Sequence, residues 1–401
     1  MPEVDFNPLA PGYLENPYDS YRELLTQDPV HWSNRMNAWI VTRHADVTLV
    51  LKDQRFGRGA PGVTAEQRLA SVPPAILPLS RMQESWMLFK NPPEHTRLRG
   101  LVNMAFTPRT IERLRPHVQG IANRLLDGVQ DRGQMDLIRD FAFPLAVVVI
   151  AELLGVPAQD QAQIREWSTV LAATVDATTD PGIYVRGAQV AQELSAYLQQ
   201  IIAERRRQPQ QDLISELIAA EEQGQKLTED EMIATSVLLL VAGHETTVHT
   251  IGNSVLTLCK HPDQLELLRA RPDLIPSAVE EFLRFESALS VTVRTAQKDV
   301  ELGGKLIRAG QDVHALLGAA NRDPAVFADP DRLDITRSPN NHLAFAVGNH
   351  YCVGAPLARL EVQIALATLL QRLPHLALAS EQPQWKRSVV FRGLTALPIT
   401  F

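Results

Sequence analysis

Residues 345–354 read Phe-Ala-Val-Gly-Asn-His-Tyr-Cys-Val-Gly and lead directly into a long amphipathic helical pattern. This pattern places Cys352 at a helix N-terminus, where positive partial charge and unpaired N–H groups favour a thiolate. Gly348 and Gly354 suit positive φ angles and the close approach of a flat ligand, because neither carries a Cβ. The stretch therefore predicts a thiolate presented into a cavity as a ligand.

Two simpler interpretations of this cysteine compete with that prediction. A lone cysteine in a globular protein is usually a small buried hydrophobe. A zinc site is disfavoured, because Cys259 is the only other cysteine and the chain has no Cys-x-x-Cys pair. The ligand interpretation gains its weight from other stretches of the chain.

The cysteine stretch resembles the haem-binding loop of the cytochrome P450 family, Phe-Gly-x-Gly-x-His/Arg-x-Cys-x-Gly. Every fixed position matches except Ala346, where the family usually has glycine. The resemblance implies haem b as cofactor and Cys352 as the proximal ligand of its iron, a thiolate that favours O–O cleavage. It also implies further cofactor-binding positions in this loop, namely Phe345, Gly348, His350 and Gly354.

Composition is that of a globular protein with a large core. The 401 residues are 45% hydrophobic and 21% charged, with a net charge of −7, so a nucleic-acid partner is not expected. Two cysteines favour a reducing compartment. The first residues predict no secretory signal, and no apolar run predicts a membrane anchor, so we expect a cytoplasmic protein.

Periodicity predicts a mainly α fold with a small β-region, as in the cytochrome P450 fold, in one domain over residues 1–401. We expect the helical bulk at about 92–285 and 353–373, and the β-region at about 29–52, 290–318 and 385–401. The finer predictions are an irregular stretch over 57–91, a Gly-Gly hairpin over 300–307 and a final hairpin over 389–401.

A long central helix is predicted from a capping box of Thr228 and Glu231 to His261, where Pro262 stops it. Midway lies Ala-Gly-His-Glu-Thr-Thr, residues 242–247. A glycine inside a helix costs about 1 kcal/mol relative to alanine. From the residues alone, this glycine indicates either a helix crossing or the close approach of a bulky group.

The same stretch resembles the oxygen-activating segment of the P450 family, Ala/Gly-Gly-x-Asp/Glu-Thr-Thr/Ser. The resemblance implies that Glu245 and Thr246 are catalytic and organise water to deliver protons to dioxygen. It implies that Ala242 and Gly243 contact the cofactor. His244 occupies a variable position and is expected to be structural.

Further positions point to haem carboxylates and to a salt bridge. His95 and Arg99 are four residues apart on one helix face, which is usually a solvated face. The resemblance implies that these two, with Arg294 and His342, hold haem propionates. Glu281 and Arg284 form the family's Glu-x-x-Arg motif, a buried salt bridge joined by a later arginine, for which we expect Arg332.

The reaction implied is monooxygenation, in which one oxygen atom enters a C–H bond or alkene and the other leaves as water. The chain has no flavin or iron–sulfur motif, so electrons come from outside, and the resemblance implies a ferredoxin and its reductase. We expect a monomer. Candidate residues for a basic patch that binds ferredoxin are Arg97, Arg109 and Arg359.

Positions that the resemblance places at the substrate pocket are all apolar, which predicts a lipophilic substrate. A peroxide-driven peroxygenase, a haem-thiolate isomerase and a non-catalytic haem or lipophile carrier stay open as alternatives. The acid–alcohol pair at 245–246 favours the monooxygenase over all three. The pocket positions are Leu88, Phe89, Val170, Leu238, Leu239, Ala242, Ala288, Leu289, Val291 and Val390.

Overall fold

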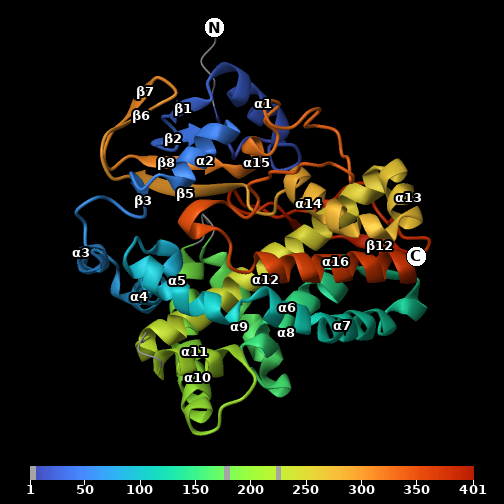
Figure 1. Cartoon of the computed structure of the whole chain (residues 1–401), viewed down its shortest axis with the longest axis horizontal. Helices are drawn as coiled ribbons and strands as arrows, with labels where there is room; N and C mark the ends of the chain where they lie inside the picture. Colours follow the sequence, from blue (N-terminus) through green and yellow to red (C-terminus); the bar gives the residue numbers. More distant parts are fainter. Residues whose placement is uncertain (1–5, 176–180, 223–226) are drawn as a thin grey trace. The chain divides into compact units, whose positions relative to one another are not determined.

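The computed structural model in Figure 1 describes residues 6–175, 181–222 and 227–401. The chain forms two compact units, each made of several segments. Unit 1 comprises Met1–Pro61, Pro116–Phe143 and Thr246–Phe401, and unit 2 comprises Gly62–Arg115 and Pro144–Glu245. One domain over residues 1–401 stays a prediction.

Unit 1 contains a five-stranded sheet with the strand order β1-β2-β8-β5-β3. Only β2 and β8 run parallel, and the other neighbours are antiparallel. The predicted sheet in the β-region is therefore confirmed. The strands are β1 (Val30–Ser33), β2 (Ala38–Val41), β8 (Asp312–Leu316), β5 (Val291–Ala296) and β3 (Phe56–Gly57).

The predicted Gly-Gly hairpin is confirmed as β6 (Val300–Leu302) and β7 (Lys305–Ile307). Gly303 and Gly304 have φ angles of 56° and 74°, the left-handed conformations that a tight hairpin turn requires.

The predicted hairpin at the end of the chain is wrong. β11 (Leu394–Ala396) pairs with β10 (Gln384–Trp385), whereas β12 (Pro398–Thr400) pairs with β4 (Gln134–Asp136) and β9 (Ala377–Leu378). The chain changes sheets at Leu397, whose N–H donates to the Asp136 carboxylate at 3.0 Å. The alternating pattern indicated strands correctly but could not show which strands pair.

In unit 1, α2 and α15 lie against the five-stranded sheet, whereas α13, α14 and α16 lie to one side of it (Figure 1). The cysteine loop leads into α16, and α14 carries the Glu-x-x-Arg motif. The bounds are α1 (Tyr18–Gln27), α2 (His44–Lys52), α7 (Arg115–Asp127), α13 (Pro262–Ala270), α14 (Ile275–Phe285), α15 (Leu317–Ala320) and α16 (Ala355–Arg372), with a π-helical turn at Ile138–Ala142. The first residue of α7, Arg115, is still counted in unit 2.

Unit 2 is mainly helical in its described residues, including most of residues 65–89, which fall within the stretch 57–91 that we predicted to be irregular. α3 (Ala65–Ala70) begins with a capping box of Thr64 and Gln67, and α4 (Leu77–Glu84) has a proline in its first turn. That prediction was wrong because the prolines begin helices rather than break them. The remaining helices are α5 (Glu94–Ala105), α6 (Pro108–Arg113), α8 (Phe143–Leu153), α9 (Gln161–Ala173), α10 (Gly182–Arg207) and α11 (Leu213–Glu222).

The central helix α12 (Glu229–Lys260) belongs to both units, since the boundary falls between Glu245 and Thr246. Its predicted capping box is confirmed. The Thr228 N–H donates to Glu231 Oε2 at 2.9 Å, and the Glu231 N–H donates to Thr228 Oγ1 at 3.2 Å. Within the ranges described here, no helix is both long and apolar enough to cross a membrane.

Candidate functional site

The cysteine loop folds back on itself just ahead of α16. The Cys352 N–H donates to the Phe345 carbonyl at 3.0 Å, and the Ala346 N–H donates to the Leu343 carbonyl at 2.8 Å. Gly354 is the N-cap residue of α16, so Cys352 lies two residues before the cap. Its side chain is partly exposed. The sequence thus presents one thiol at the start of a buried helix, as predicted from its spacing.

Two positions in the loop have left-handed backbone. Gly348 has φ 76°, and a Cβ there would lie 2.6 Å from the Leu51 carbonyl oxygen, so the loop packs too closely against α2 for any side chain. Gly354 has φ −80°, so its predicted positive φ is wrong, because an N-cap residue does not need it. Ala346 has φ 55°, which is strained for a residue with a Cβ.

His342, which is predicted to hold a propionate, contacts protein groups through both ring nitrogens. Nε2 lies 3.0 Å from Glu280 Oε2, and Nδ1 accepts the Ala344 N–H at 3.2 Å. Glu280 also accepts two hydrogen bonds from Arg359, at 2.6 and 2.7 Å. His342 thus connects the segment before the cysteine loop to α14, and its predicted contact with a haem propionate stays a prediction.

The charge state of Glu280 follows from these partners. Burial alone would raise the pKa of this carboxyl, but hydrogen bonds from Arg359 and His342 outweigh burial and lower the pKa to about 2. Glu280 is thus ionised throughout the physiological pH range. It ties α14 to α16, which carries Arg359.

The Glu-x-x-Arg pair is fully buried. Arg284 binds Glu281 through Nε and Nη2, each at 2.8 Å, with both side chains at 0% exposure. The remaining guanidinium donors reach the carbonyls of Asn321 and Pro330. Because every charged group has close partners, the pair fixes the path of the segment that precedes the cysteine loop.

The third member of this network is Arg337 rather than Arg332. Arg337 Nε lies 3.1 and 3.2 Å from the two Glu281 oxygens. The Arg332 side chain is 67% exposed and binds Asp334, and only its backbone carbonyl accepts from the network. Both arginines lie in coil, so helical spacing could not decide between them.

Arg294 is a buried cation on β5 and only 3% exposed. It donates to Thr292 Oγ1 at 3.3 Å and to the Val293 carbonyl at 2.9 Å. Burial lowers the pKa of Arg294 to about 10. A buried guanidinium whose partners among the described residues are neutral suits an anionic group such as a propionate.

In unit 2, His95 and Arg99 lie one turn apart on α5. His95 is 3% exposed, which is unusual for a histidine on a solvated helix face. Arg99 Nε donates to Asn103 Oδ1 at 2.9 Å, which orients the guanidinium. The solvated-face interpretation therefore fails for His95.

The residues in the middle of α12 divide into two roles. A Cβ on Gly243 would lie 3.0 Å from Ile150 Cδ1 and Cγ1, so this glycine allows α12 to pack closely on α8. This packing supports the helix crossing that the sequence left open, and the predicted cofactor contact of Gly243 stays a prediction. Ala242, by contrast, is exposed between buried Val241 and His244, which leaves room beside the helix for a flat group.

The acid–alcohol pair, Glu245 and Thr246, comes next along α12. Glu245 has a side-chain exposure of 12% and its Oε2 lies 3.6 Å from His244 Nε2. His244 is fully buried, with Nδ1 2.9 Å from the Leu240 carbonyl oxygen, so it is structural as expected. The carbonyl of Thr246 accepts the Thr250 hydroxyl at 2.8 Å.

The predicted pocket residues occupy different environments. Val291 is buried in a core cluster with Tyr13 and Tyr21, and its predicted pocket role stays a prediction. Phe89 is 37% exposed and stacks on Trp86 with ring centroids 6.0 Å apart. Of the others, Leu238, Leu239 and Ala288 are buried and Leu88, Val170, Leu289 and Val390 are half-buried.

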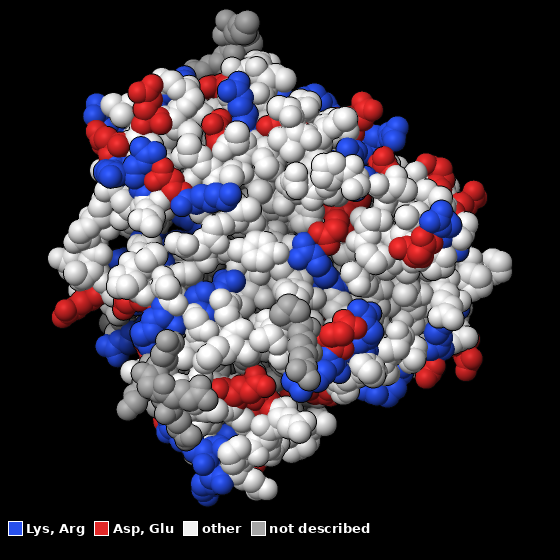
Figure 2. All heavy atoms as spheres, viewed as in Figure 1, with Lys and Arg blue, Asp and Glu red and all other residues white. Residues whose placement is uncertain are grey.

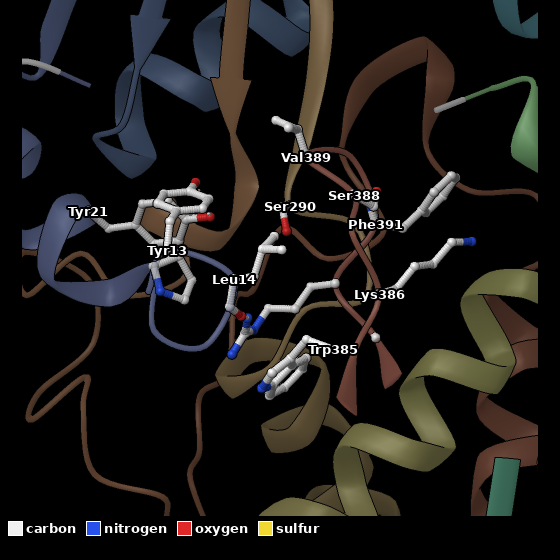
Figure 3. Close-up of a pocket in the computed structure, with 12 residues that line it drawn as sticks. Tyr13, Leu14, Tyr21, Ser290, Trp385, Lys386, Ser388, Val389 and Phe391 are labelled. Atoms are coloured by element: carbon white, nitrogen blue, oxygen red, sulfur yellow. Dashed lines mark hydrogen bonds between the residues drawn. The ribbon is translucent and has the colours of Figure 1, made fainter. Parts of the chain in front are cut away.

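A separate cavity lies in unit 1 and contains none of the predicted catalytic residues (Figure 3). Tyr13, Leu14 and Tyr21 come from the N-terminal segment and line it on one side. Ser290, Trp385, Lys386, Ser388, Val389 and Phe391 line the rest. This cavity is therefore distinct from the cysteine site.

The donor set fits a haem rather than a metal held by protein ligands. Among the residues that the structure describes, no three His, Cys, Asp or Glu side chains come together as a metal cluster. Burial raises the pKa of the Cys259 thiol to about 11, so that cysteine is inert. A porphyrin supplies four iron ligands and needs one more from the protein, which matches Cys352.

Comparisons with known proteins agree with this site. A profile of the family "Cytochrome P450" matches residues 77–392. The biotin biosynthesis cytochrome P450 of Bacillus subtilis (strain 168) is 46% identical over 391 residues, which is 97% of each chain.

Two solved structures extend the comparison. That of P450BioI in complex with a hexadec-9Z-enoic acid ligated acyl carrier protein has a TM-score of 0.91 and 46% identity, over 97% of this chain and 99% of that one. That of the myxobacterial P450 CYP267B1 in complex with myristic acid has a TM-score of 0.88 and 41% identity, over 98% of each chain.

The chain belongs to the cytochrome P450 family. It has the P450 fold, uses haem b and is a monooxygenase, as the resemblance implied. The features that carry this assignment are the cysteine loop, the buried Glu281–Arg284 pair and the acid–alcohol pair of α12.

Proposed function

We propose that this P450 inserts one oxygen atom from dioxygen into a long-chain fatty acyl substrate or a molecule of similar lipophilicity. The observation that carries the proposal is the likeness, over nearly the full chain, to a P450 bound to a fatty acyl carrier protein. A second related structure holds myristic acid. The predicted pocket positions of this chain are apolar throughout, which suits a hydrocarbon chain.

The proposed roles of the residues follow from their positions. Cys352 holds the haem iron, and the haem supplies the oxidising chemistry when bound. His95, Arg99, Arg294 and His342 hold the propionates, and His350 contacts the cofactor from the cysteine loop. Glu245 and Thr246 move protons, with the Glu245 carboxylate oriented by its contact with His244.

The experiment is a ligand titration followed by product analysis. Purified ferric enzyme is titrated with myristic acid, with a fatty acyl chain on acyl carrier protein and with a steroid, and the spin-state shift is recorded. Turnover products are then identified by mass spectrometry. We expect the fatty acyl ligands to shift the spin state and to be hydroxylated or epoxidised. A shift with the steroid alone would reject the fatty acyl proposal.

Electrons are proposed to come from a ferredoxin and its reductase. The predicted basic patch is weakly supported by its residues, because Arg97 pairs with Glu231 and Arg359 with Glu280, and the Arg109 side chain lies outside the described residues. On the face drawn in Figure 2, basic and acidic side chains are likewise interspersed. Charge reversal at Arg97 and Arg359 that slows ferredoxin-driven turnover at low salt only would support the patch.

The same assays separate the alternatives. A peroxygenase would turn over with hydrogen peroxide alone at a comparable rate, without ferredoxin and reductase. A carrier would bind the fatty acyl ligand but form no product, and Thr246→Ala would change nothing. A monooxygenase loses product formation on Thr246→Ala while it retains ligand binding. A cytoplasmic monomer stays a prediction.

A further inference from the structure

A second cavity of unit 1 shares Trp385 and Arg392 with the cavity in Figure 3. Its volume is about 230 Å³, and its lining comes from the start of α1, the last turns of α12, the end of α14 and β10. An apolar cavity of about 150 Å³ holds benzene. The second cavity therefore has room for one substituted six-membered ring.

Two arginines alternate with three aromatic rings in this lining. The guanidinium carbon of Arg322 lies 3.8 Å from the ring centroid of Phe285 and 4.0 Å from that of Tyr18. The guanidinium carbon of Arg392 lies 5.3 Å from the same Tyr18 ring and 3.9 Å from the Trp385 ring. Such cation–π contacts hold both guanidinium groups in place without using their N–H groups.

Arg392 has N–H groups left for a further acceptor. A guanidinium has five N–H donors. Arg392 donates one to Glu286 Oε2 at 2.6 Å and one each to the carbonyls of Leu14 and Glu15, at 2.7 and 3.3 Å. The residues that the structure describes thus take only part of its hydrogen-bonding capacity.

Arg322 is the more deeply buried of the two, with a side-chain exposure of 7%. Its Nη1 donates to Asp331 Oδ1 at 2.8 Å, and its Nη2 donates to the Phe285 carbonyl at 2.7 Å. Its Nε is buried and has no hydrogen-bond partner in the described part of the chain. A buried donor without an acceptor carries a free-energy cost, which favours a ligand that supplies oxygen acceptors to this lining.

The charge of the lining also favours an anion. Its cations are the two arginines and Lys260, and its carboxylates are Glu15 and Glu286, so cations exceed carboxylates by one, not counting a histidine. Burial raises the pKa of Glu286, but the charge of Arg392 outweighs burial and lowers the pKa, so Glu286 is ionised and already paired. Asp331 is not part of the lining, and water screens its pairing with an arginine because its side chain is 50% exposed.

We propose that this cavity binds a small aromatic carboxylate, whose oxygens accept hydrogen bonds from the two arginines of the lining. Carboxylate oxygens match the N–H edge of a guanidinium, and such charge-assisted hydrogen bonds are the strong ones. The ring of the ligand packs beside Tyr18, Phe285 and Trp385. The lining contains none of the residues predicted to bind haem or the lipophilic substrate, so the site is independent of the proposed function.

The first test compares three probes of the same shape by ligand-observed fluorine NMR of the holoenzyme. The probes are 4-fluorobenzoate, 4-fluorobenzamide and 4-fluorobenzylamine. Excess 1-phenylimidazole, whose nitrogen ligates haem iron, is present throughout, so that the probes report only sites away from the haem. We expect the carboxylate to bind about 10-fold more tightly than the amide, the effect of one charge-assisted hydrogen bond, and the amine to bind most weakly. Absence of carboxylate binding, equal binding of acid and amide, or tighter binding of the amine would overturn the proposal.

The second test locates the probe with two exposed residues of the lining, which leaves the buried stack of rings and arginines in place. Lys260→Glu should weaken 4-fluorobenzoate binding by about 5-fold, and Glu15→Gln should strengthen it by about 2-fold at low salt. Lys298→Glu is the matched control, because Lys298 is an exposed lysine of unit 1 outside the lining. Unchanged binding in Lys260→Glu, or an equal loss in Lys298→Glu, would reject this cavity as the site.

A third variant tests the aromatic part of the site. Trp385→Ala removes one ring of the lining and should weaken the acid and the amide alike, by about 5-fold, because both probes lose the same ring contact. If this variant does not yield holoenzyme, the two variants of exposed residues still decide. Unchanged binding of both probes in folded Trp385→Ala would reject the aromatic carboxylate as the ligand class.

Discussion

Two fully buried glutamates of unit 1 show opposite ways of carrying a carboxyl group. Glu281 on α14 receives hydrogen bonds from Arg284, Arg337, Asn340 and the Asp334 N–H. Glu361 on α16 is equally buried, yet neither carboxyl oxygen has a partner of normal geometry among the described residues. The hydrogen bonds of Glu281 offset the free-energy cost of burying its carboxylate, whereas the cost of burying the Glu361 carboxyl is not offset in this way.

The contrast extends to the backbone of the cysteine loop. The Glu-x-x-Arg region has its charges offset by partners on several segments. The cysteine loop and α16 instead retain two uncompensated features, the buried acid at Glu361 and the left-handed alanine at Ala346. The segment before the cysteine loop is thus fixed by a satisfied ion-pair network. The cysteine loop and α16, by contrast, keep one unfavourable backbone conformation and one unfavourably buried carboxyl group.

The largest expected effect comes from breaking the anchored glutamate. Arg284→Ala leaves Glu281 buried without its bidentate partner, so we expect a loss of about 3–5 kcal/mol of stability. Holoenzyme should accumulate poorly, and its ferrous carbon monoxide spectrum should show loss of the thiolate-ligated species. A variant with wild-type thermal stability would mean that Glu281 is held by its other donors.

The next effect distinguishes the two later arginines. Arg337→Ala removes a direct donor to Glu281 and should cost about 1–3 kcal/mol. Arg332→Ala removes only an exposed side chain and should stay within about 0.5 kcal/mol of wild type. Urea denaturation of both variants side by side compares their losses in the free energy of unfolding. A larger loss for Arg332→Ala would support Arg332, the arginine predicted from the sequence, as the third member of the network.

These two arginines also show what sequence could predict. The thiol loop, the capping box of α12 and the pair Glu281–Arg284 are local in sequence, so spacing and resemblance were sufficient. Arg337 was missed because it lies in coil, where no periodicity selects the side chain that turns inward. The contact of His342 with Glu280 was not predicted, because the two residues are 62 positions apart in the chain.

Other errors came from the same limit. The prolines of residues 57–91 were taken as breakers, although Thr64 and Gln67 contained a capping signal that could have revealed α3. Contacts between residues that are far apart in the sequence therefore could not be predicted from the sequence alone.

The unsatisfied glutamate should reveal itself through pH. Burial raises the pKa of Glu361 well above the ordinary carboxyl range, and a hydrogen bond from the Thr247 hydroxyl offsets only part of that rise. Above the unfolded pKa of about 4.3, the folded state therefore binds a proton that the unfolded state lacks, and stability falls as pH rises until the folded pKa is reached.

Glu361→Gln removes that titration in both states. We expect the variant to match wild type near pH 4 and to gain stability relative to wild type as pH rises from the unfolded pKa to the folded pKa, by at most about 1.4 kcal/mol per pH unit. Urea denaturation at several pH values from 4 to 7 measures the difference. A difference that does not change with pH would show that Glu361 ionises normally in the folded protein.

The smallest expected effect concerns the backbone at Ala346. Its φ of 55° is the conformation that the usual glycine adopts without strain, so Ala346→Gly should stabilise the enzyme by about 1 kcal/mol. Ala344→Gly is the matched control, because Ala344 is outside the positive-φ positions and loses about 0.5–1 kcal/mol through backbone entropy. Both changes in stability are measured as shifts of the thermal midpoint of the holoenzyme. A rise for Ala346→Gly and a fall for Ala344→Gly would locate the strain at Ala346. Equal losses of stability in the two variants would mean that the loop backbone relaxes around Ala346. The contrast between the Glu281 network and the cysteine-loop region would then depend on Glu361 alone.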